Sequence, residues 1–277
     1  MSTVFIGILS FVVLLILVFL HMPISIVMLI VGAVGYALVV NPQAALVKLG
    51  TDTFNNASVY TLSVIPMFLL MGLFLGTSGL ARRLFDAFNA WFGHIRGGLA
   101  IATVAASAFF SAVSGSNIGT AATIGKVAVP EMRLRKYKDS LSAGCVAAGG
   151  TLGILIPPSS LMIIYGALTE ESIGKLLIAG IFPGILTAVL LALTAWLQVK
   201  LNPSLAPTGS LVPLKIRMQT FKRIWPVPVI FAISMGGIWL GVFTATEGGA
   251  IGAFLSLLYA LLSRQLTKKG LNSALEE

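Results

Sequence analysis

The chain has 277 residues, of which 57% are hydrophobic and 10% are charged, and its mean hydropathy is +0.99. A water-soluble domain carries about 25% charged residues, so this composition excludes a soluble domain and indicates an all-α polytopic membrane protein. The single cysteine, Cys145, cannot form a disulfide within the chain. The net charge of +9 comes from basic residues that lie between apolar runs, where membrane topology explains them without a nucleic acid partner.

Charge-free runs mark the expected helices, because a charged residue at the centre of a bilayer helix costs about 2.5 to 3.5 kcal/mol. Residues 1–47 contain no Asp, Glu, Lys or Arg, and His21-Met22-Pro23 interrupts them, which predicts two helices near 3–20 and 24–40. Further charge-free runs cover 53–81, 97–125, 140–169, 176–199, 224–246 and 248–263. With the exception of 97–125, these runs predict about seven membrane-crossing helices, of which those in 1–78 form an N-terminal scaffold.

Basic residues between the runs predict which segments face the cytoplasm. Residues 79–96, 126–139 and 200–223 carry net charges of +2, +3 and +5. In contrast, residues 41–58 are neutral and residues 170–175 carry a net charge of −1. We therefore expect the three basic segments on the cytoplasmic side and the other two on the opposite side.

Residues 79–96 predict an interfacial amphipathic arm helix. Its large apolar residues fall on one helical face, away from the arginines, and are Leu80, Leu84, Phe88, Trp91 and Phe92. Such a helix either anchors the chain at the membrane surface or ties the following segment to the scaffold helices. The sequence favours neither role over the other.

The run 97–125 lies between two segments that both predict the cytoplasmic side, so a single crossing would violate the charge rule. It is built of Ala, Ser, Thr and Gly around Phe109 and Phe110. We therefore expect a re-entrant hairpin over 97–130 with its tip at Ser114-Gly115-Ser116-Asn117, since irregular backbone is tolerated at membrane depth only where protein buries it or it lines a cavity. The alternative is one plain helix that packs through small residues.

Residues 137–169 predict a broken helix. Gly150 and Gly153 precede the sequence Ile156-Pro157-Pro158-Ser159, and adjacent prolines remove hydrogen-bond donors and disfavour helix at the preceding residue. In transporters the unwound carbonyls of such helices bind Na⁺, while the amide groups at half-helix N-termini bind carboxylates. The break is therefore a candidate binding element.

The remaining segments complete the expected topology. Residues 176–225 predict a helix and a basic cytoplasmic loop, and 226–263 predict a helix pair around Thr244-Ala245-Thr246-Glu247. Glu247 is interpreted as an interfacial residue or a helix cap, whereas a carboxylate within the membrane would be a functional candidate. The tail 264–277, which contains Arg264, Lys268 and Lys269, should return to the cytoplasm.

Two polar motifs follow one another along the chain, Ser114-Gly115-Ser116-Asn117 and Leu155-Ile156-Pro157-Pro158-Ser159. Further motifs surround them at residues 66–72, 121–125, 150–154, 163–166, 179–184 and 244–247. Over essentially its whole length the chain therefore resembles the large membrane subunit of the tripartite ATP-independent periplasmic (TRAP) transporters.

The resemblance implies an elevator-type secondary transporter, and not an enzyme, in the bacterial inner membrane. It would take up organic acids such as C4-dicarboxylates or sialic acid by symport with Na⁺, without a cofactor. A periplasmic solute-binding protein would deliver the substrate, and a small four-helix membrane subunit would be the second partner.

The resemblance also implies that the hairpin tip and the helix break together hold Na⁺ and face the substrate. The residues carried over to this site are Ser114, Gly115, Ser116, Asn117, Thr123, Gly150, Gly153, Pro157, Pro158 and Ser159, with Thr123 the weaker candidate. The two interruptions offer hydroxyl, amide and main-chain oxygens without a net charge, and oxygen ligands suit a hard cation.

Two features depart from the family pattern. Members of the family are longer and contain a second, inverted repeat, so we expect this chain to be truncated relative to them. It would then be a fragment, a truncated gene product, or one piece of a split subunit for which a separate chain supplies the second repeat. The sequence Thr244-Ala245-Thr246-Glu247 also differs from the family's usual Thr-Pro-Thr-Glu, which bears on the local turn.

Two other functions stay open from the sequence. A non-transporting scaffold, or a split half of a membrane complex, would assemble with other subunits and would have no reason to bind Na⁺. An intramembrane serine hydrolase would use Ser114 or Ser116 and needs a base within hydrogen-bond reach, but His21 and His94 are expected at helix ends near the interface. The sequence contains no HExxH pair, P-loop or GxGxxG motif.

Overall fold

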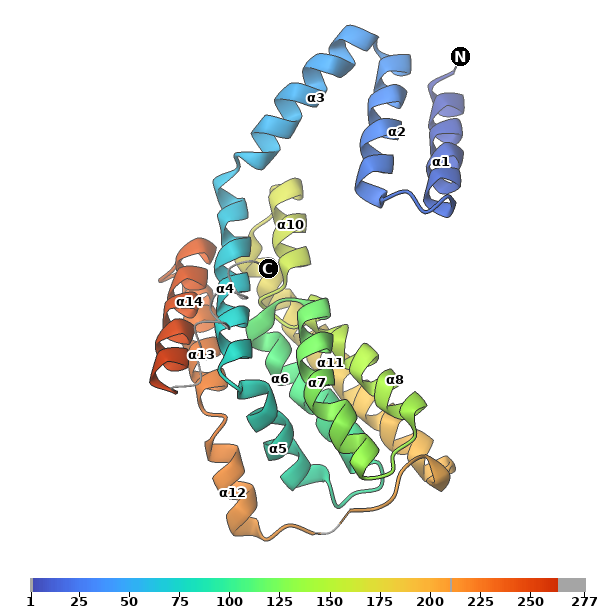
Figure 1. The fold of residues 1–277 in the computed structure, drawn as a ribbon. Coiled ribbons are helices and arrows are strands. Elements are labelled where there is room, and N and C mark those ends of the chain that lie inside the picture. The colour runs from blue at the N-terminus through green and yellow to red at the C-terminus, as the bar shows by residue number, and fades with distance from the viewer. Residues whose placement is uncertain (1, 210, 264–277) are drawn as a thin grey trace. The chain divides into compact units, whose positions relative to one another are not determined.

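The computed structural model describes residues 2–209 and 211–263, and all regular elements in this part of the chain are helices (Figure 1). The expected cytoplasmic tail, with Arg264, Lys268 and Lys269, lies outside the described residues. The chain divides into two compact units, Met1–Tyr60 and Thr61–Glu277, which are described separately.

The first unit contains three helices, α1 Thr3–Phe19, α2 Ile24–Val39 and α3 Pro42–Ala57. Most large apolar side chains of α1 and α2 are exposed, as expected for helices whose solvent is lipid. Helix α3 occupies a segment that the charge pattern treats only as a neutral connection. The Ala44 amide donates to the side-chain oxygen of Asn41 at 2.6 Å, and Pro42 occupies the first turn, a combination that favours helix initiation.

The second unit contains the longer series of helices. A 3-10 helix, η1 Tyr60–Ser63, precedes them. The helices are α4 Val64–Thr77, α5 Leu80–Phe92, α6 Gly98–Ser114, α7 Asn117–Leu134, α8 Asp139–Gly150, α9 Leu152–Leu155, α10 Ser160–Thr169, α11 Ile173–Leu201, α12 Leu214–Lys222, α13 Pro226–Trp239 and α14 Ala245–Leu262. A short 3-10 helix, η2 Pro203–Leu205, and α12 lie within the segment expected as a basic loop.

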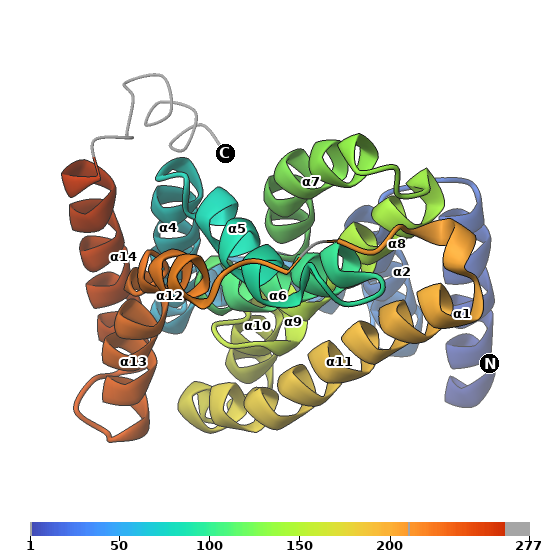
Figure 2. The ribbon, with the colours of Figure 1, turned by 90° about the horizontal axis from the view of Figure 1, so that it is seen from below.

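Helix α6 lies at the centre of this unit and contacts α4, α5, α7, α8 and α11 (Figure 2). Its small residues, including the fully buried Ala100, Ala102 and Ala106, allow these neighbours to approach closely. Helix α4 packs along α14, and α13 packs beside α14. The other helices of the unit therefore enclose a helix that is rich in Ala and Ser.

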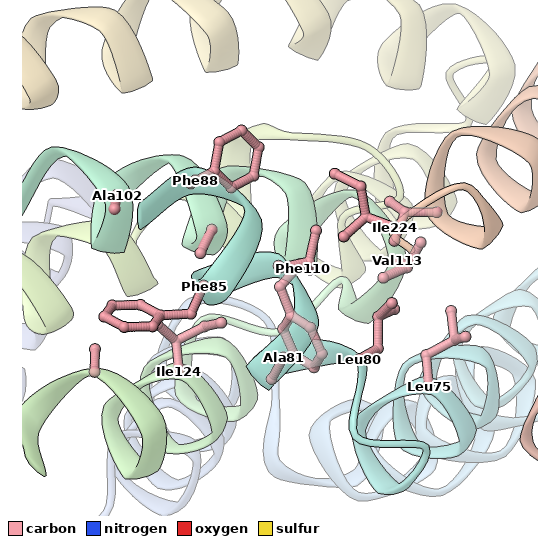
Figure 3. Packing of buried hydrophobic residues seen from close by; sticks show 14 of the residues in the cluster. Leu75, Leu80, Ala81, Phe85, Phe88, Ala102, Phe110, Val113, Ile124 and Ile224 are labelled. Carbon is pink, nitrogen blue, oxygen red and sulfur yellow. The ribbon is translucent and has the colours of Figure 1, made fainter. Parts of the chain in front are cut away.

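Helix α5 is embedded in protein (Figure 3). Leu80 and Leu84 are completely buried, and Phe85 and Phe88 pack with Phe110 of α6 in the same core. These side chains therefore contact other helices, whereas Trp91 and Phe92 at the end of the same face are half-buried. Helix α5 also contacts α6 and α7 of the hairpin. Its roles as a membrane-surface anchor and as a tie to the hairpin both stay predictions.

The charged edge of α5 makes a second connection to the hairpin. The Arg82 guanidinium donates to the Glu131 carboxylate of α7 at 2.7 Å, and its Nε lies 3.7 Å from the Asp86 carboxylate. Burial raises the pKa of Asp86, and the neighbouring Arg82 opposes this shift.

Four helices are long and apolar enough to span a membrane within the described residues. They cover Tyr60–Thr77, Asp139–Thr169, Ile173–Leu201 and Ala245–Leu262, and the bent pair Leu214–Lys222 and Pro226–Trp239 would make a fifth. The apolar helices α1, α2 and α6 are shorter. The expected number of about seven crossings stays a prediction, as does the elevator architecture.

Candidate functional site

The tip of the α6–α7 hairpin is a tight turn at Gly115 and Ser116. Gly115 has a φ of 61°, in the left-handed region, and its amide donates to the Ser111 carbonyl at 3.2 Å, which ends α6. The Ser116 hydroxyl accepts a hydrogen bond from the Gly119 amide at 3.1 Å and caps α7. The chain thus reverses direction within two residues. Whether the hairpin enters and leaves the membrane on one side stays a prediction.

The helix break lies between Leu155 and Ser160. Helix α9 ends at Leu155, the chain is extended at Ile156 and Ser159, and a cis peptide bond joins Pro157 and Pro158. The Ser159 hydroxyl donates to the Ile154 carbonyl at 2.7 Å and accepts from the Met162 amide at 3.4 Å. One buried hydroxyl therefore satisfies backbone groups on both sides of the break.

The tip and the break are in direct contact. The Gly115 carbonyl accepts hydrogen bonds from the Ser160 amide at 3.3 Å and from the Ser160 hydroxyl at 3.1 Å. A Cβ atom on Gly115 would lie 2.7 Å from the Pro158 carbonyl oxygen, and one on Gly153 would lie 2.6 Å from the Ser116 carbonyl oxygen. Both positions therefore require glycine, because the two backbones meet without side chains between them.

This contact brings together helix ends of both kinds. Helix α6 and the α8–α9 segment end here and present main-chain carbonyls, while α7 and α10 begin here and present amide groups. Residues 114–117 and 150–160 contain no Asp, Glu, Lys or Arg. The arrangement can therefore offer carbonyl oxygens to a cation and helix N-termini to an anion.

Hydroxyl groups form a buried cluster behind the tip. The Ser114 and Thr120 hydroxyl oxygens are 2.7 Å apart, and the Ser111 hydroxyl donates to that of Thr120 at 3.4 Å. The partners of the Ser114 hydroxyl are Thr120 and the Ser116 carbonyl, and the partner of the Ser116 hydroxyl is the Gly119 amide. Among the described residues no basic or acidic side chain forms a hydrogen bond with either serine. A serine nucleophile requires an adjacent general base, and the described residues around these two serines do not supply one.

Not all the residues predicted for the site lie at this contact. Gly150 packs on α7, since its Cβ would lie 3.1 Å from the Asn117 carbonyl oxygen. The Asn117 side chain is exposed and accepts from the Ile118 amide at 2.7 Å. Pro157 lines an apolar cavity of about 540 Å³ with residues of α6, α11 and α13. Thr123 lies about two turns into α7, away from the tip.

Three residues that shape the contact were not predicted from the sequence. Ser160 bonds Gly115, Thr120 pairs with Ser114, and a Cβ on Gly72 of α4 would lie 2.6 Å from the Ser114 Cα. Ser160 directly follows the predicted Ser159, and Thr120 lies one helical turn after Ser116. These spacings were the only features of the sequence that could have indicated Ser160 and Thr120. The contact between tip and break is what distinguishes their hydroxyls from the other serine and threonine hydroxyls of the chain.

Glu247 belongs to a capping box at the start of α14. The Thr244 amide donates to its carboxylate at 2.8 Å, and the Glu247 amide donates to the Thr244 hydroxyl at 3.3 Å. The carboxylate thus satisfies backbone groups at a helix N-terminus. The cap interpretation of Glu247 accounts for this geometry.

These features define the class of the protein. It is a helical membrane protein in which a helical hairpin contacts the break of an interrupted, membrane-length helix.

Comparison with known proteins gives the family. The family described as tripartite ATP-independent periplasmic transporter, DctM component, matches residues 11–277. The chain is 42% identical over 215 residues to the C4-dicarboxylate TRAP transporter large permease protein DctM of Pseudomonas aeruginosa, which covers 77% of this chain and 50% of that protein. The chain belongs to this family.

Two further relatives carry different names. The ectoine/5-hydroxyectoine TRAP transporter large permease protein UehC of Ruegeria pomeroyi is 38% identical over 217 residues, covering 77% of this chain and 49% of the relative. The isethionate TRAP transporter permease protein DctMQ of Oleidesulfovibrio alaskensis is 37% identical over 214 residues, covering 74% and 32%. The chain thus spans about half the length of the curated relatives it matches, or less.

Proposed function

We propose that this chain forms part of a secondary active transporter of the bacterial inner membrane that couples Na⁺ to the uptake of an organic acid. The observation that carries the proposal is the direct contact between the hairpin tip and the helix break, where Ser160 donates two hydrogen bonds to Gly115. Interrupted helices that meet in this way free backbone groups within the membrane, and such groups bind ions and substrates in transporters.

The oxygen atoms around this contact support Na⁺ as the coupling ion. The Ser116 and Pro158 carbonyl oxygens lie at the closest approaches of the two backbones, and the Ser114 hydroxyl oxygen is 3.5 Å from the Ser116 carbonyl oxygen. All of these groups offer uncharged oxygen atoms as ligands to a cation. A monovalent hard cation is bound by such oxygens without a carboxylate.

The helix N-termini at the same contact support an anionic substrate group. Helices α7 and α10 both begin there, and the N-terminus of a helix favours a negative charge. C4-dicarboxylates, sialic acid and ectoine carry carboxylates and isethionate carries a sulfonate, so the proposed class is an organic acid and its identity requires a substrate panel.

The proposal includes two partners. A periplasmic solute-binding protein delivers the substrate, and a small four-helix membrane subunit joins this chain. One comparison supports an associated membrane subunit. The relative named isethionate TRAP transporter permease protein DctMQ has a name that adds the letter Q to DctM.

The test is sodium-driven uptake by the complex that contains Ser114→Ala and Ser116→Ala together. We expect uptake to fall to background, because the change removes the tip hydroxyls while the backbone remains. The control replaces two exposed serines, Ser140→Ala and Ser204→Ala, and should transport normally. Expression and thermal stability are measured in parallel, since loss of a helix cap alone costs about 1 kcal/mol.

Uptake at the control rate would show that these hydroxyls do not belong to the site.

A second readout distinguishes a transporter from a scaffold without measuring transport. Asn117→Cys, placed at an exposed position in a Cys145→Ser background, should react more slowly with a maleimide in Na⁺ than in K⁺. Equal rates in both salts would favour the scaffold function.

A further inference from the structure

A basic pocket lies away from the candidate site, where α5, the α12–α13 junction and α14 meet. It has a volume of about 530 Å³, and its lining residues are Arg83, Lys222, Arg223, Trp225 and Tyr259. Helix α12 contacts α5, and α13 contacts α14, so the pocket is formed by elements that are distant in sequence but packed together (Figure 2). Neither the family description nor the relatives' names assign a role to it.

None of the three cations of the pocket forms an ion pair among the described residues, where the ion pairs join Lys48 to Asp52, Arg82 to Asp86, Arg82 to Glu131 and Arg133 to Asp139. Arg83 instead donates a hydrogen bond to the Tyr259 hydroxyl and lies 5.9 Å from the centre of its ring. Asp86 of α5 is near enough for Arg223 to lower the pKa of its carboxyl, but Arg82 already pairs with that carboxylate. The cluster of three cations therefore keeps a net positive charge.

Aromatic side chains form one side of the pocket. The rings of Trp225 and Tyr259 meet edge to face with their centres 6.3 Å apart, and Trp225 is more than half exposed. Tryptophan and tyrosine are enriched where membrane helices meet the headgroup region. Beyond Trp225 the chain enters the apolar helix α13, which places the pocket at the boundary between a basic segment and an apolar one.

An exposed apolar side chain lies on the same face of α14 as the pocket residue Tyr259. Leu262 follows Tyr259 by three residues, close to one helical turn, and is 74% exposed. A free anion would use the cations alone, whereas a phospholipid would use the cations, the aromatic rings and this apolar surface together. The combination favours the lipid.

We propose that this pocket binds the phosphate of an anionic phospholipid headgroup, with Arg83, Lys222 and Arg223 as its partners. The bound headgroup holds the α12–α13 junction against α5 and α14. The same basic segment predicts the cytoplasmic side, so the lipid belongs to the leaflet on that side. This inference does not depend on the identity of the transported substrate.

The test measures phosphatidylglycerol binding to the whole chain by native mass spectrometry, with phosphatidylcholine as the neutral lipid. The variant is Lys222→Gln with Arg223→Gln, two exposed positions where folding should be retained. The matched control is Lys136→Gln with Lys138→Gln, which removes the same charge from exposed positions outside the pocket. Each basic residue near an anionic surface contributes about fivefold in affinity, so we expect the variant to bind about 30-fold more weakly.

We expect the control pair to retain the preference of the wild-type chain for phosphatidylglycerol within about twofold. Equal loss in both pairs would overturn the proposal, because it would reflect the net charge of the chain and not a site. A parallel experiment with inorganic phosphate distinguishes a phospholipid headgroup from a free phosphate as the bound anion. Displacement of phosphatidylglycerol by millimolar phosphate, or retention in the pocket variant, would also overturn the lipid assignment.

Discussion

Gly153 has only a hydrogen atom where other residues have a Cβ, and this allows the hairpin tip and the helix break to approach closely. A Cβ at this position would meet the Ser116 carbonyl oxygen at 2.6 Å, its carbonyl carbon at 2.7 Å and the Asn117 nitrogen at 2.9 Å. All three atoms belong to backbone, so no side chain can rotate away to make room. The distance between the hairpin tip and the helix break is therefore fixed by the absence of a side chain.

We expect Gly153→Ala to destabilise the second unit by about 1 to 3 kcal/mol, the usual cost of overpacking, and to reduce sodium-driven uptake. The measurement is thermal unfolding of the purified chain together with uptake by the complex. The matched control is Gly144→Ala on α8, where a Cβ would meet nothing within 4 Å. If both variants behaved alike, the close approach would have no energetic consequence.

At the scale of elements, the hairpin is held on two sides. The α5 core and the Arg82–Glu131 ion pair join it to α5, and the Ser160 hydrogen bonds join its tip to α10. Arg82 is about half exposed, and such pairs contribute little stability, so the apolar packing of Leu84, Phe85 and Phe110 carries most of the connection to α5. A movement of the hairpin would therefore carry α5 with it.

The sequence indicated the helices better than it indicated their partners. The polar turn at Gly115-Ser116 and the Pro157-Pro158 break are local signals, because glycine and proline act on their own backbone. In contrast, the apolar face of α5 has the same pattern whether lipid or α6 covers it, so its burial could not be derived. The bond from Ser160 to Gly115 joins residues 45 positions apart and is likewise a tertiary property.

The re-entrant path of the hairpin can be measured by cysteine accessibility. We expect Arg96→Cys and Lys126→Cys, each in a Cys145→Ser background, to react with an impermeant maleimide from the cytoplasmic side, because the segments that flank the hairpin are both basic. Both positions are exposed, so labelling reports sidedness and not burial. Glu171→Cys, which is exposed in a segment of net charge −1, serves as the control and should react from the opposite side. Labelling of 96 and 126 from opposite sides would establish a single crossing.

At the scale of the whole molecule, the interrupted helix ends are enclosed by protein. The second unit buries the hydroxyls of Ser111, Ser114, Thr120 and Ser159 near the tip and the break, and it buries other serine and threonine hydroxyls elsewhere along its helices. Membrane helices in contact with lipid satisfy their backbone groups internally, so irregular backbone must be enclosed by protein. The central position of α6 follows from this requirement, since it carries the turn that the other helices enclose.

The proposed partners lead to the last prediction, which concerns the assembly. We expect a sodium gradient to drive uptake of at least one member of a labelled panel of C4-dicarboxylates and sialic acid when vesicles contain this chain together with its binding protein and membrane partners. Vesicles with this chain alone should show none, because the proposal assigns substrate delivery to the binding protein and includes a membrane subunit. Replacing the gradient of Na⁺ by one of K⁺ is the control and should abolish uptake, since the neutral oxygens at the tip and break are proposed to select the ion. Uptake by the chain alone would contradict the need for these partners, whereas transport driven equally by K⁺ would contradict the sodium site while leaving membership of the family intact.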